Sequence, residues 1–283
     1  MIHQYLPHPA DIIVNDFVTA VCRIIPDTIE GIYLTGSITL NDFYPEKSDI
    51  DFIVLCRGLP NEKEKKELLR IHQQISRRVR KPDLSGHYLD ITRINALHTV
   101  QIQALAYQEG KLRKINFELA PVYLWELTAN AITVYGTKPE SLPIRIDHAT
   151  LNAFLFNNMN SYWNTWIRHH SSFLNRKVLL WLFPRLTEWV ILGMARQLCT
   201  LETGQIVSKT EAGQYGLKDL PAKFHPVFRQ AIDIRKDSRT YPLVRSYAIR
   251  PSLSRMRRTL ECAYYINALF NSIYLKTHDE SPS

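Results

Sequence analysis

Cysteine is scarce in this sequence, and long apolar runs are missing from it. No two cysteines form a CxxC pair, and none has a histidine nearby at metal-site spacing. This argues against a zinc site or a disulfide framework and favours buried free thiols in a reducing cytosol. No apolar stretch approaches the roughly 20 residues that span a bilayer, and the first residues lack the basic-then-apolar layout of a signal peptide. We therefore expect a cytoplasmic protein with no membrane partner. The four cysteines are Cys22, Cys56, Cys199 and Cys262.

Internal repeats and low-complexity tracts are also absent. The 283 residues are 45% apolar and 22% charged, which is ordinary for a globular chain with a sizeable core and favours about two domains. The residue composition changes after "GTKPESLP": residues 147–200 are rich in Leu, Trp and Asn and nearly free of glycine. We expect an α/β domain over residues 1–145 and an all-helical domain over residues 146–283.

Positive charge is in excess, with a formal net charge of +8 and a pI near 9.3. Such a balance suits a polyanionic partner, for example nucleic acid, an anionic membrane or a nucleoside triphosphate. Basic residues gather in "SRRVRK" at 76–81 and "RMRR" at 255–258. Solvated helix ends would explain the same clusters, so composition alone does not choose between these partners.

Hydrophobic spacing predicts the secondary structure that positions the candidate site. Glycine-bounded or aspartate-bounded apolar runs indicate strands, and apolar residues at helical spacing indicate helices. The expected strands are 31–36, 48–56, 86–94 and 131–136. The expected helices are 10–25, one within 59–81, two short ones within 205–235 and a long one over 246–275.

Two aspartates stand at the start of the second expected strand, in "SDIDFIVLC". Side chains alternate along a strand, so Asp49 and Asp51 point to the same face. Two unpaired carboxylates near a core are costly, and a divalent cation or arginines could neutralise them. One or two carboxylates completed by water and substrate phosphates describe a magnesium site. An isolated DxD motif is a weak signal, so it does not by itself decide between a cation and arginine partners.

The Gly36-Ser37 step strengthens the magnesium interpretation. A strand that ends in Gly-Ser and turns tightly exposes backbone N–H groups and a hydroxyl, which can cradle phosphate oxygens. Glycine is needed because a side chain there would hold the phosphate away. Taken alone, the dipeptide is also compatible with an ordinary turn.

Asp90 is a third carboxylate, inside the strand expected over 86–94. If that strand lies beside the second one, Asp90 comes close to Asp49 and Asp51. Three carboxylates could hold two magnesium ions for in-line displacement at phosphorus, and Asp90 could accept the hydroxyl proton as general base. The alternative is a salt bridge to Arg93 or to a basic residue of 76–81.

These motifs resemble the DNA polymerase β-like nucleotidyltransferase superfamily, which combines Gly-Ser, a loop, Asp-x-Asp on the next strand and a later carboxylate. Residues 195–235 resemble the helical C-terminal domain of bacterial aminoglycoside adenylyltransferases of the streptomycin/spectinomycin type. The shared features are an arginine followed by a Thr-Gly turn, a Ser-Lys helix start and a Leu-Pro-Ala step. The resemblance implies an α/β nucleotidyltransferase domain with a small mixed sheet, followed by a helical bundle.

The same resemblance implies an activity with ATP and magnesium: AMP moves from ATP to an antibiotic hydroxyl, and pyrophosphate is released. Gly36 and Ser37 would contact phosphate, and Ser48 would line the nucleotide site. Asp49 and Asp51 would be the metal ligands. Asp90 would be the catalytic carboxylate and a further metal ligand, although the family usually has a glutamate there, which is one methylene longer.

Three residues of the C-terminal half carry over with open alternatives. Lys209 matches a lysine that reaches the triphosphate, and Arg196 lies where a phosphate-facing arginine is expected. Tyr265 falls near an aromatic residue that packs on the nucleotide. The alternatives are a solvated lysine at a helix start and an arginine paired with Glu188 or Glu202.

The acceptor is less well marked than the nucleotide. The tryptophan and aspartate with which the family's streptomycin binders hold the sugar have no clear match, although Trp125, Glu118 and Glu188 lie in the corresponding regions. Anionic contacts to a polycation could come from Asp42, Glu126, Asp147 and Glu188. We expect a monomer that acts on a small antibiotic and has no nucleic-acid partner. An RNA or protein acceptor, or a non-catalytic nucleotide-binding module, are the competing hypotheses.

Overall fold

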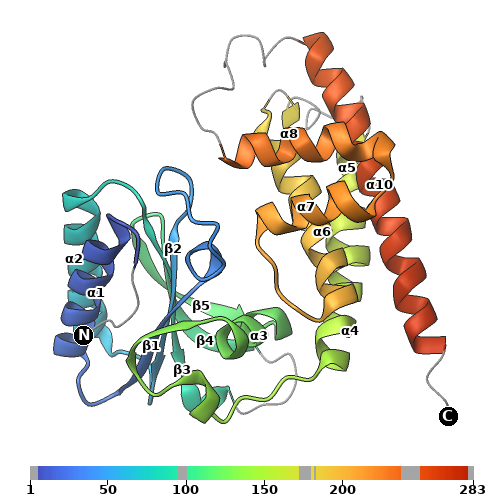
Figure 1. The fold of residues 1–283 in the computed structure, drawn as a ribbon. Helices are drawn as coiled ribbons and strands as arrows, with labels where there is room; N and C mark the ends of the chain where they lie inside the picture. Colours follow the sequence, from blue (N-terminus) through green and yellow to red (C-terminus); the bar gives the residue numbers. More distant parts are fainter. Residues whose placement is uncertain (1–5, 95–100, 172–179, 182, 237–248, 280–283) are drawn as a thin grey trace. The chain divides into compact units, whose positions relative to one another are not determined.

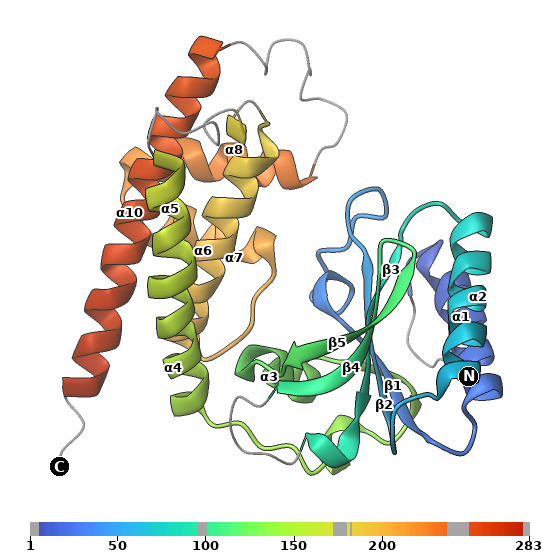
Figure 2. The same cartoon turned by 180° about the vertical axis from the view of Figure 1, so that it is seen from behind.

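The computed structural model describes residues 6–94, 101–171, 180–181, 183–236 and 249–279. The chain divides into two compact units, Met1–Asp147 and His148–Ser283. Figures 1 and 2 show the ribbon from opposite sides. Among the described residues, no helix has both the length and the apolarity that crossing a membrane requires.

The first unit contains a mixed sheet of six strands in the order β5-β4-β3-β2-β1-β6. β2 and β3 are parallel, and every other neighbouring pair is antiparallel. This is the small mixed sheet with helices that the sequence predicted. The elements are α1 (Ala10–Ile24), β1 (Ile29–Thr35), β2 (Ile50–Cys56), α2 (Glu62–Arg78), β3 (Leu84–Asp90), β4 (Gln101–Gln108), β5 (Lys111–Glu118), α3 (Pro121–Ala129) and β6 (Ile132–Gly136).

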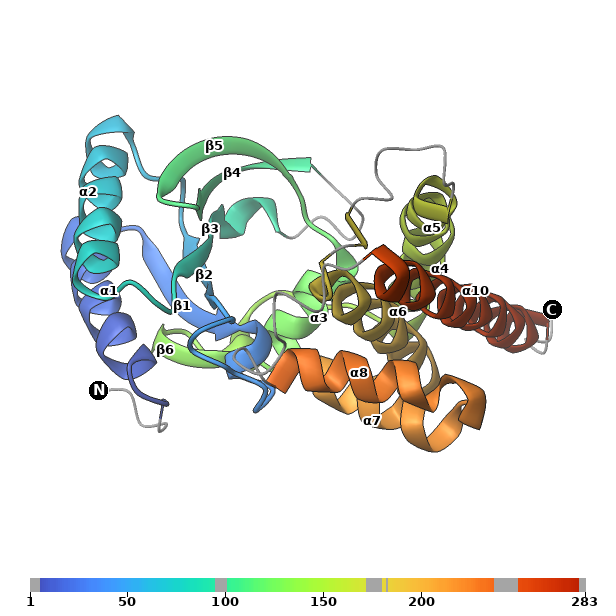
Figure 3. The ribbon, with the colours of Figure 1, turned by 90° about the horizontal axis from the view of Figure 1, so that it is seen from above.

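Helices cover both faces of the sheet. α1 and α2 lie side by side on one face, and α3 lies on the other (Figure 3). α2 begins with a capping box, in which the Asn61 side chain accepts from the Glu64 N–H and the Glu64 carboxylate accepts from the Asn61 N–H. Its acidic first turn and basic last turn suit the helix dipole.

The central strand β2 is apolar on both faces because it is covered on both. Phe52 and Val54 belong to the core under α1 and α2, whereas Ile53 and Leu55 belong to the core under α3. Side chains alternate along a strand, so Asp51 shares the α3 face with Ile53 and Leu55. The alternation therefore directs the candidate carboxylate toward α3.

The second unit is helical, as the sequence predicted. Its central helix, α6, packs against α7, α8 and α10. The predicted helix over 246–275 corresponds to α10, and its residues 246–248 lie outside the described residues. The helices are α4 (His148–Asn158), which continues through a π-helical turn (Met159–Trp163) into α5 (Asn164–Ser171), then α6 (Arg185–Thr203), α7 (Lys209–Asp219), α8 (His225–Lys236) and α10 (Ile249–Asp279).

Candidate active site

The turn after β1 brings the Gly-Ser step against Asp51. Residues Gly36–Ile38 form one 3-10 turn directly after the strand, and β1 pairs Thr35 with Asp51. Gly36 has a φ of +71°, and a Cβ at this position would lie 2.2 Å from Asp51 Oδ2. Only glycine fits this approach without strain. The sequence motif and the carboxylate thus form one small site on the α3 side of the sheet.

The N–H of Gly36 donates to a carboxylate. Its acceptor is Glu126 Oε1, at 2.8 Å, and Glu126 comes from α3, 90 residues later in the chain. Tyr123, one helical turn earlier on α3, is close to both acidic groups. Burial raises the pKa of the Tyr123 phenol, and the charges of Asp51 and Glu126 raise it further. Asp51, Glu126 and the Gly36 N–H are therefore neighbours near this phenol.

Asp49 lies just before β2, and its side chain is about half exposed. Lys81 approaches it at 3.8 Å and also pairs with Asp83 at 2.6 Å. Partial burial raises the pKa of Asp49, the Lys81 ammonium opposes this rise, and the Asp83 charge adds to it. A bound cation would favour the ionised form of Asp49 and so oppose the rise of its pKa.

Asp90 does not join the two aspartates, so the prediction of a converging trio is wrong. The parallel register of β2 and β3 places Ser85 opposite Asp51 and Asp90 opposite Cys56, about 17 Å further along the strand. Cys56 and Tyr88 pack under α1 and α2, so alternation puts Asp90 on that face as well. Asp90 therefore lies near the opposite end of the paired strands from Asp51, and on the opposite face of the sheet.

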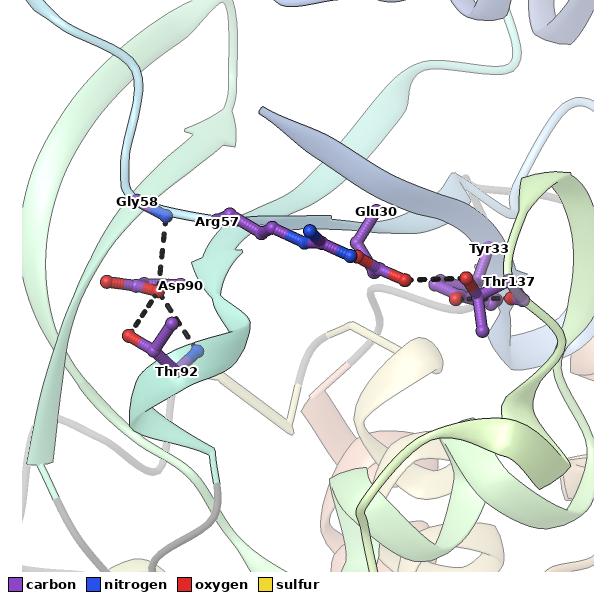
Figure 4. Close-up of polar contacts among 7 residues, drawn as sticks. All are labelled: Glu30, Tyr33, Arg57, Gly58, Asp90, Thr92 and Thr137. Atoms are coloured by element: carbon purple, nitrogen blue, oxygen red, sulfur yellow. Dashed lines mark hydrogen bonds and ion pairs between the residues drawn. The ribbon is translucent and has the colours of Figure 1, made fainter. Parts of the chain in front are cut away.

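Asp90 has a structural role instead. Its Oδ1 accepts from the Gly58 N–H at 3.2 Å, the Thr92 N–H at 3.0 Å and the Thr92 hydroxyl at 2.7 Å (Figure 4). It thereby caps the 3-10 turn Ile91–Arg93 and anchors the segment after β2. Figure 4 also shows Glu30, whose carboxylate accepts hydrogen bonds from the Arg57 Nε–H and the Thr137 hydroxyl. The alternative, a salt bridge of Asp90 to Arg93 or to a basic residue of 76–81, is not found in the part of the chain that the structure describes, where Arg78 pairs with Asp16 and Lys81 with Asp49 and Asp83.

Beside Asp51, β3 presents Ser85 and His87 rather than a carboxylate. His87 Nδ1 lies 3.2 Å from the Tyr123 hydroxyl, and its ring packs on Phe117 at 4.2 Å. Burial lowers the pKa of His87 to about 4, so the ring is neutral near pH 7. Within the described residues, no group of three or more His, Cys, Asp or Glu side chains is arranged to hold a metal ion.

Ser37 and Ser48 order the loop between β1 and β2. The carbonyl of Ser37 accepts from the Asp42 N–H at 3.1 Å. Ser48 is buried, and its hydroxyl accepts from the Tyr44 N–H while its own N–H donates to the Tyr44 carbonyl. Ser48 therefore stabilises the turn just before the aspartates, and its predicted contact with nucleotide stays a prediction.

The predicted residues of the second unit all have partners within that unit. Lys209 begins α7 and pairs with Glu188 at 3.2 Å. Arg196 Nε donates to the Val207 carbonyl at 2.8 Å. The ring of Tyr265 packs against Phe224 at 4.9 Å. Their expected roles at the triphosphate stay predictions.

Comparison with known proteins identifies both units. Residues 14–107 match the nucleotidyltransferase domain family, and residues 167–249 match the family described as "Aminoglycoside adenylyltransferase, C-terminal domain". The chain thus combines a nucleotidyltransferase domain with the C-terminal domain of the aminoglycoside adenylyltransferases. It is accordingly an ATP-dependent adenylyltransferase, in which the Gly36–Asp51 contact lies within the nucleotidyltransferase domain.

Individual relatives agree with the assignment. This adenylyltransferase is 25% identical to spectinomycin 9-adenylyltransferase of Campylobacter jejuni over 237 residues, which are 77% of this chain and 82% of that protein. It is 31% identical over 64 residues, or 23% of the chain and 64% of the relative, to a putative protein adenylyltransferase of Methanocaldococcus jannaschii. Its fold matches a spectinomycin adenyltransferase of Enterococcus faecialis, solved with ATP and spectinomycin, with a TM-score of 0.64, 14% identity and coverage of 88% and 98%.

Proposed function

We propose that this adenylyltransferase moves AMP from ATP to a hydroxyl of an aminoglycoside-type antibiotic of the streptomycin/spectinomycin class, releases pyrophosphate and requires magnesium. The observation that carries the proposal is the approach of Asp51 to Gly36, because it joins a carboxylate to a turn whose backbone N–H donates to an anionic oxygen. Both matched spectinomycin-modifying enzymes support the antibiotic class.

The donor set fits a magnesium ion with few protein ligands. Asp49 and Asp51 would hold it, and substrate phosphates and water would complete the shell, which is the usual manner of Mg²⁺ binding. A bound magnesium ion would neutralise charge on the phosphates. The two-ion arrangement expected from three carboxylates is not part of the proposal, because Asp90 lies elsewhere.

The chain's own groups have separate roles. The turn at Gly36–Ile38 would orient the triphosphate through backbone N–H groups and the Ser37 hydroxyl. The turn closed by Ser48 and Tyr44 would fix the aspartates that follow it. Positioning of this kind supplies much of the rate enhancement in phosphoryl and nucleotidyl transfer.

The proposal is tested by incubating the purified protein with ATP, Mg²⁺ and either streptomycin or spectinomycin. We expect pyrophosphate release and an antibiotic whose mass rises by one AMP group. Asp51→Asn should lower the rate by about a hundredfold or more, the scale on which loss of an active-site electrostatic group acts. Glu140→Gln, an exposed charge change in the same unit, is the control. AMP transfer to neither antibiotic, or an unimpaired Asp51→Asn variant, would count against the proposal.

A protein acceptor is the second candidate. The observation that favours it is the 31% identity of a 64-residue segment to a putative protein adenylyltransferase. Labelled ATP and a protein extract distinguish the two acceptors, since AMP would then appear on a polypeptide. Transfer of the label to the antibiotic alone would retain the first proposal.

A further inference from the structure

Glu126 matters more to the nucleotide site than its sequence position suggests. The sequence marks it only as one of several anionic contacts to a polycationic acceptor. In the structure its carboxylate lies inside the nucleotidyltransferase domain, on the N–H of Gly36 at 2.8 Å. This N–H belongs to the Gly-Ser turn on which the proposed phosphate contact depends.

A carboxylate and a phosphate oxygen compete for the same backbone N–H. Both are anionic acceptors and make charge-assisted hydrogen bonds of similar length. The 2.8 Å contact lies within the range for such bonds. One N–H donates one strong hydrogen bond, so Glu126 and a phosphate oxygen at Gly36 exclude each other.

Charge reinforces this exclusion. The Oδ2 atom of Asp51 lies only 2.2 Å from where a Cβ of Gly36 would be, so a second carboxylate already faces the turn. The Tyr123 phenol feels the charges of both Asp51 and Glu126. A triphosphate that entered here would meet two negative groups, of which Asp51 holds the cation in the proposed function and Glu126 does not.

We infer that Glu126 occupies the phosphate position of the nucleotide site in the absence of ATP and that the triphosphate must displace it. The inference rests on the proposed function, because it concerns the same turn. Only the fraction of molecules whose Gly36 N–H is released binds nucleotide fully, so the apparent dissociation constant for ATP is raised by the inverse of that fraction. Glu126 thus sets the nucleotide affinity without contacting the reacting atoms.

Calorimetric titration of ATP into the protein tests the inference, with and without Mg²⁺. Glu126→Gln removes the charge but keeps an oxygen that can accept from Gly36, and Glu126→Ala removes both. We expect ATP to bind about tenfold more tightly to Glu126→Ala, which is a difference of about 1.4 kcal/mol, and by a smaller factor to Glu126→Gln. Glu140→Gln, which removes an exposed charge of the same unit, should bind ATP as the unmodified protein does.

The possible results separate the inference from the proposed function. Weaker or unchanged ATP binding by both Glu126 variants would overturn the inference, and weaker binding specifically with Mg²⁺ would assign Glu126 to the cation instead. Tighter binding by Glu140→Gln to the same degree would also overturn it, because net charge would then be the cause. If the unmodified protein transfers AMP while the variants bind no tighter, the inference alone fails. If it binds no ATP, both fail.

Discussion

Asp90 uses one carboxylate oxygen to hold three donors that follow two different strands. Two donors belong to Thr92 in the turn after β3, and the third is the N–H of Gly58 after β2. The backbone N–H groups that it accepts from would otherwise need water, and a capping side chain typically stabilises a fold by about 1 kcal/mol. Asp90 therefore stabilises the chain where β2 and β3 end.

Replacement of Asp90 should accordingly affect stability and leave chemistry intact. We expect Asp90→Ala to lower the free energy of unfolding by about 1–2 kcal/mol, because it leaves the N–H donors without their acceptor. Asp90→Asn, which keeps Oδ1, should cost less. Urea denaturation measures the free energy of unfolding of each variant. The rate of AMP transfer, measured well below the unfolding temperature, shows whether the chemistry is intact. A stable Asp90→Asn variant with a hundredfold lower rate would restore Asp90 as a catalytic group.

The residues of the site are only partly predictable from the sequence. Gly36 and Asp51 can be predicted because each belongs to a short motif, and the alternation of side chains along a strand gives the face on which Asp51 lies. Asp90 is misplaced because adjacency of strands does not give their register, and here the register moves Asp90 five residues beyond Asp51. The contact of Glu126 with Gly36 is not predicted, because it joins residues 90 positions apart in the chain and no local pattern encodes it.

At the scale of elements, success and failure of prediction follow the strength of the local signals. The helix over 10–25 and the strand over 48–56 agree with α1 and β2 to within two residues. Pro9 and Pro26 flank the helix, and a continuous apolar run marks the strand. The β4–β5 hairpin is not predicted, since its exposed strand β5 is mostly polar. The helix α3 is also missed, because its nine residues are too few to show a helical period.

Two helices of the second unit show how glycine permits close packing. On α7, a Cβ at Gly216 would lie 2.3 Å from the Phe228 ring of α8, and one at Gly213 would lie 2.5 Å from Ile232. Phe228 is fully buried. The two glycines therefore let α7 and α8 approach more closely than any larger side chain would allow.

Gly216→Ala should destabilise the second unit despite the better helix propensity of alanine. Alanine gains about 1 kcal/mol in a helix interior, but overpacking against a rigid buried ring costs about 1–3 kcal/mol. The variant should thus unfold at a lower urea concentration, monitored by tryptophan fluorescence, since four of the five tryptophans lie in residues 148–283. Gln214→Ala, on the exposed side of α7, should change the midpoint little. A more stable Gly216→Ala would show that the Phe228 ring can move aside at no cost.

For the whole molecule, we expect the free energy of unfolding to fall in acid. His72 is buried between α2 and the sheet, where its Nε2 lies 2.8 Å from the Tyr88 hydroxyl and its ring stacks on Tyr107 at 3.7 Å. Burial lowers its pKa to about 3. A net charge of +8 adds general repulsion as carboxylates become protonated.

The direction of the pH effect follows from the protons that each state binds. Between pH 6.5, the ordinary pKa of histidine, and about 3, the unfolded chain protonates His72 while the folded chain does not. Stability therefore falls as the pH is lowered through this window, by at most about 1.4 kcal/mol per pH unit for one such histidine. His87, whose pKa burial lowers to about 4, adds to the loss between pH 6.5 and 4.

We expect His72→Phe to flatten this dependence. Phenylalanine keeps an aromatic ring against Tyr107 but has no proton to bind, so its free energy of unfolding should decline less between pH 6.5 and 4.5 than that of the unmodified protein. Urea denaturation at several pH values, followed by far-UV circular dichroism, gives the slopes, and the slope is informative even if loss of the Tyr88 hydrogen bond lowers stability at every pH. His8→Gln, at an exposed position, should leave the slope unchanged. Equal slopes for His72→Phe and the unmodified protein would mean that His72 is protonated as readily in the folded chain as in the unfolded one.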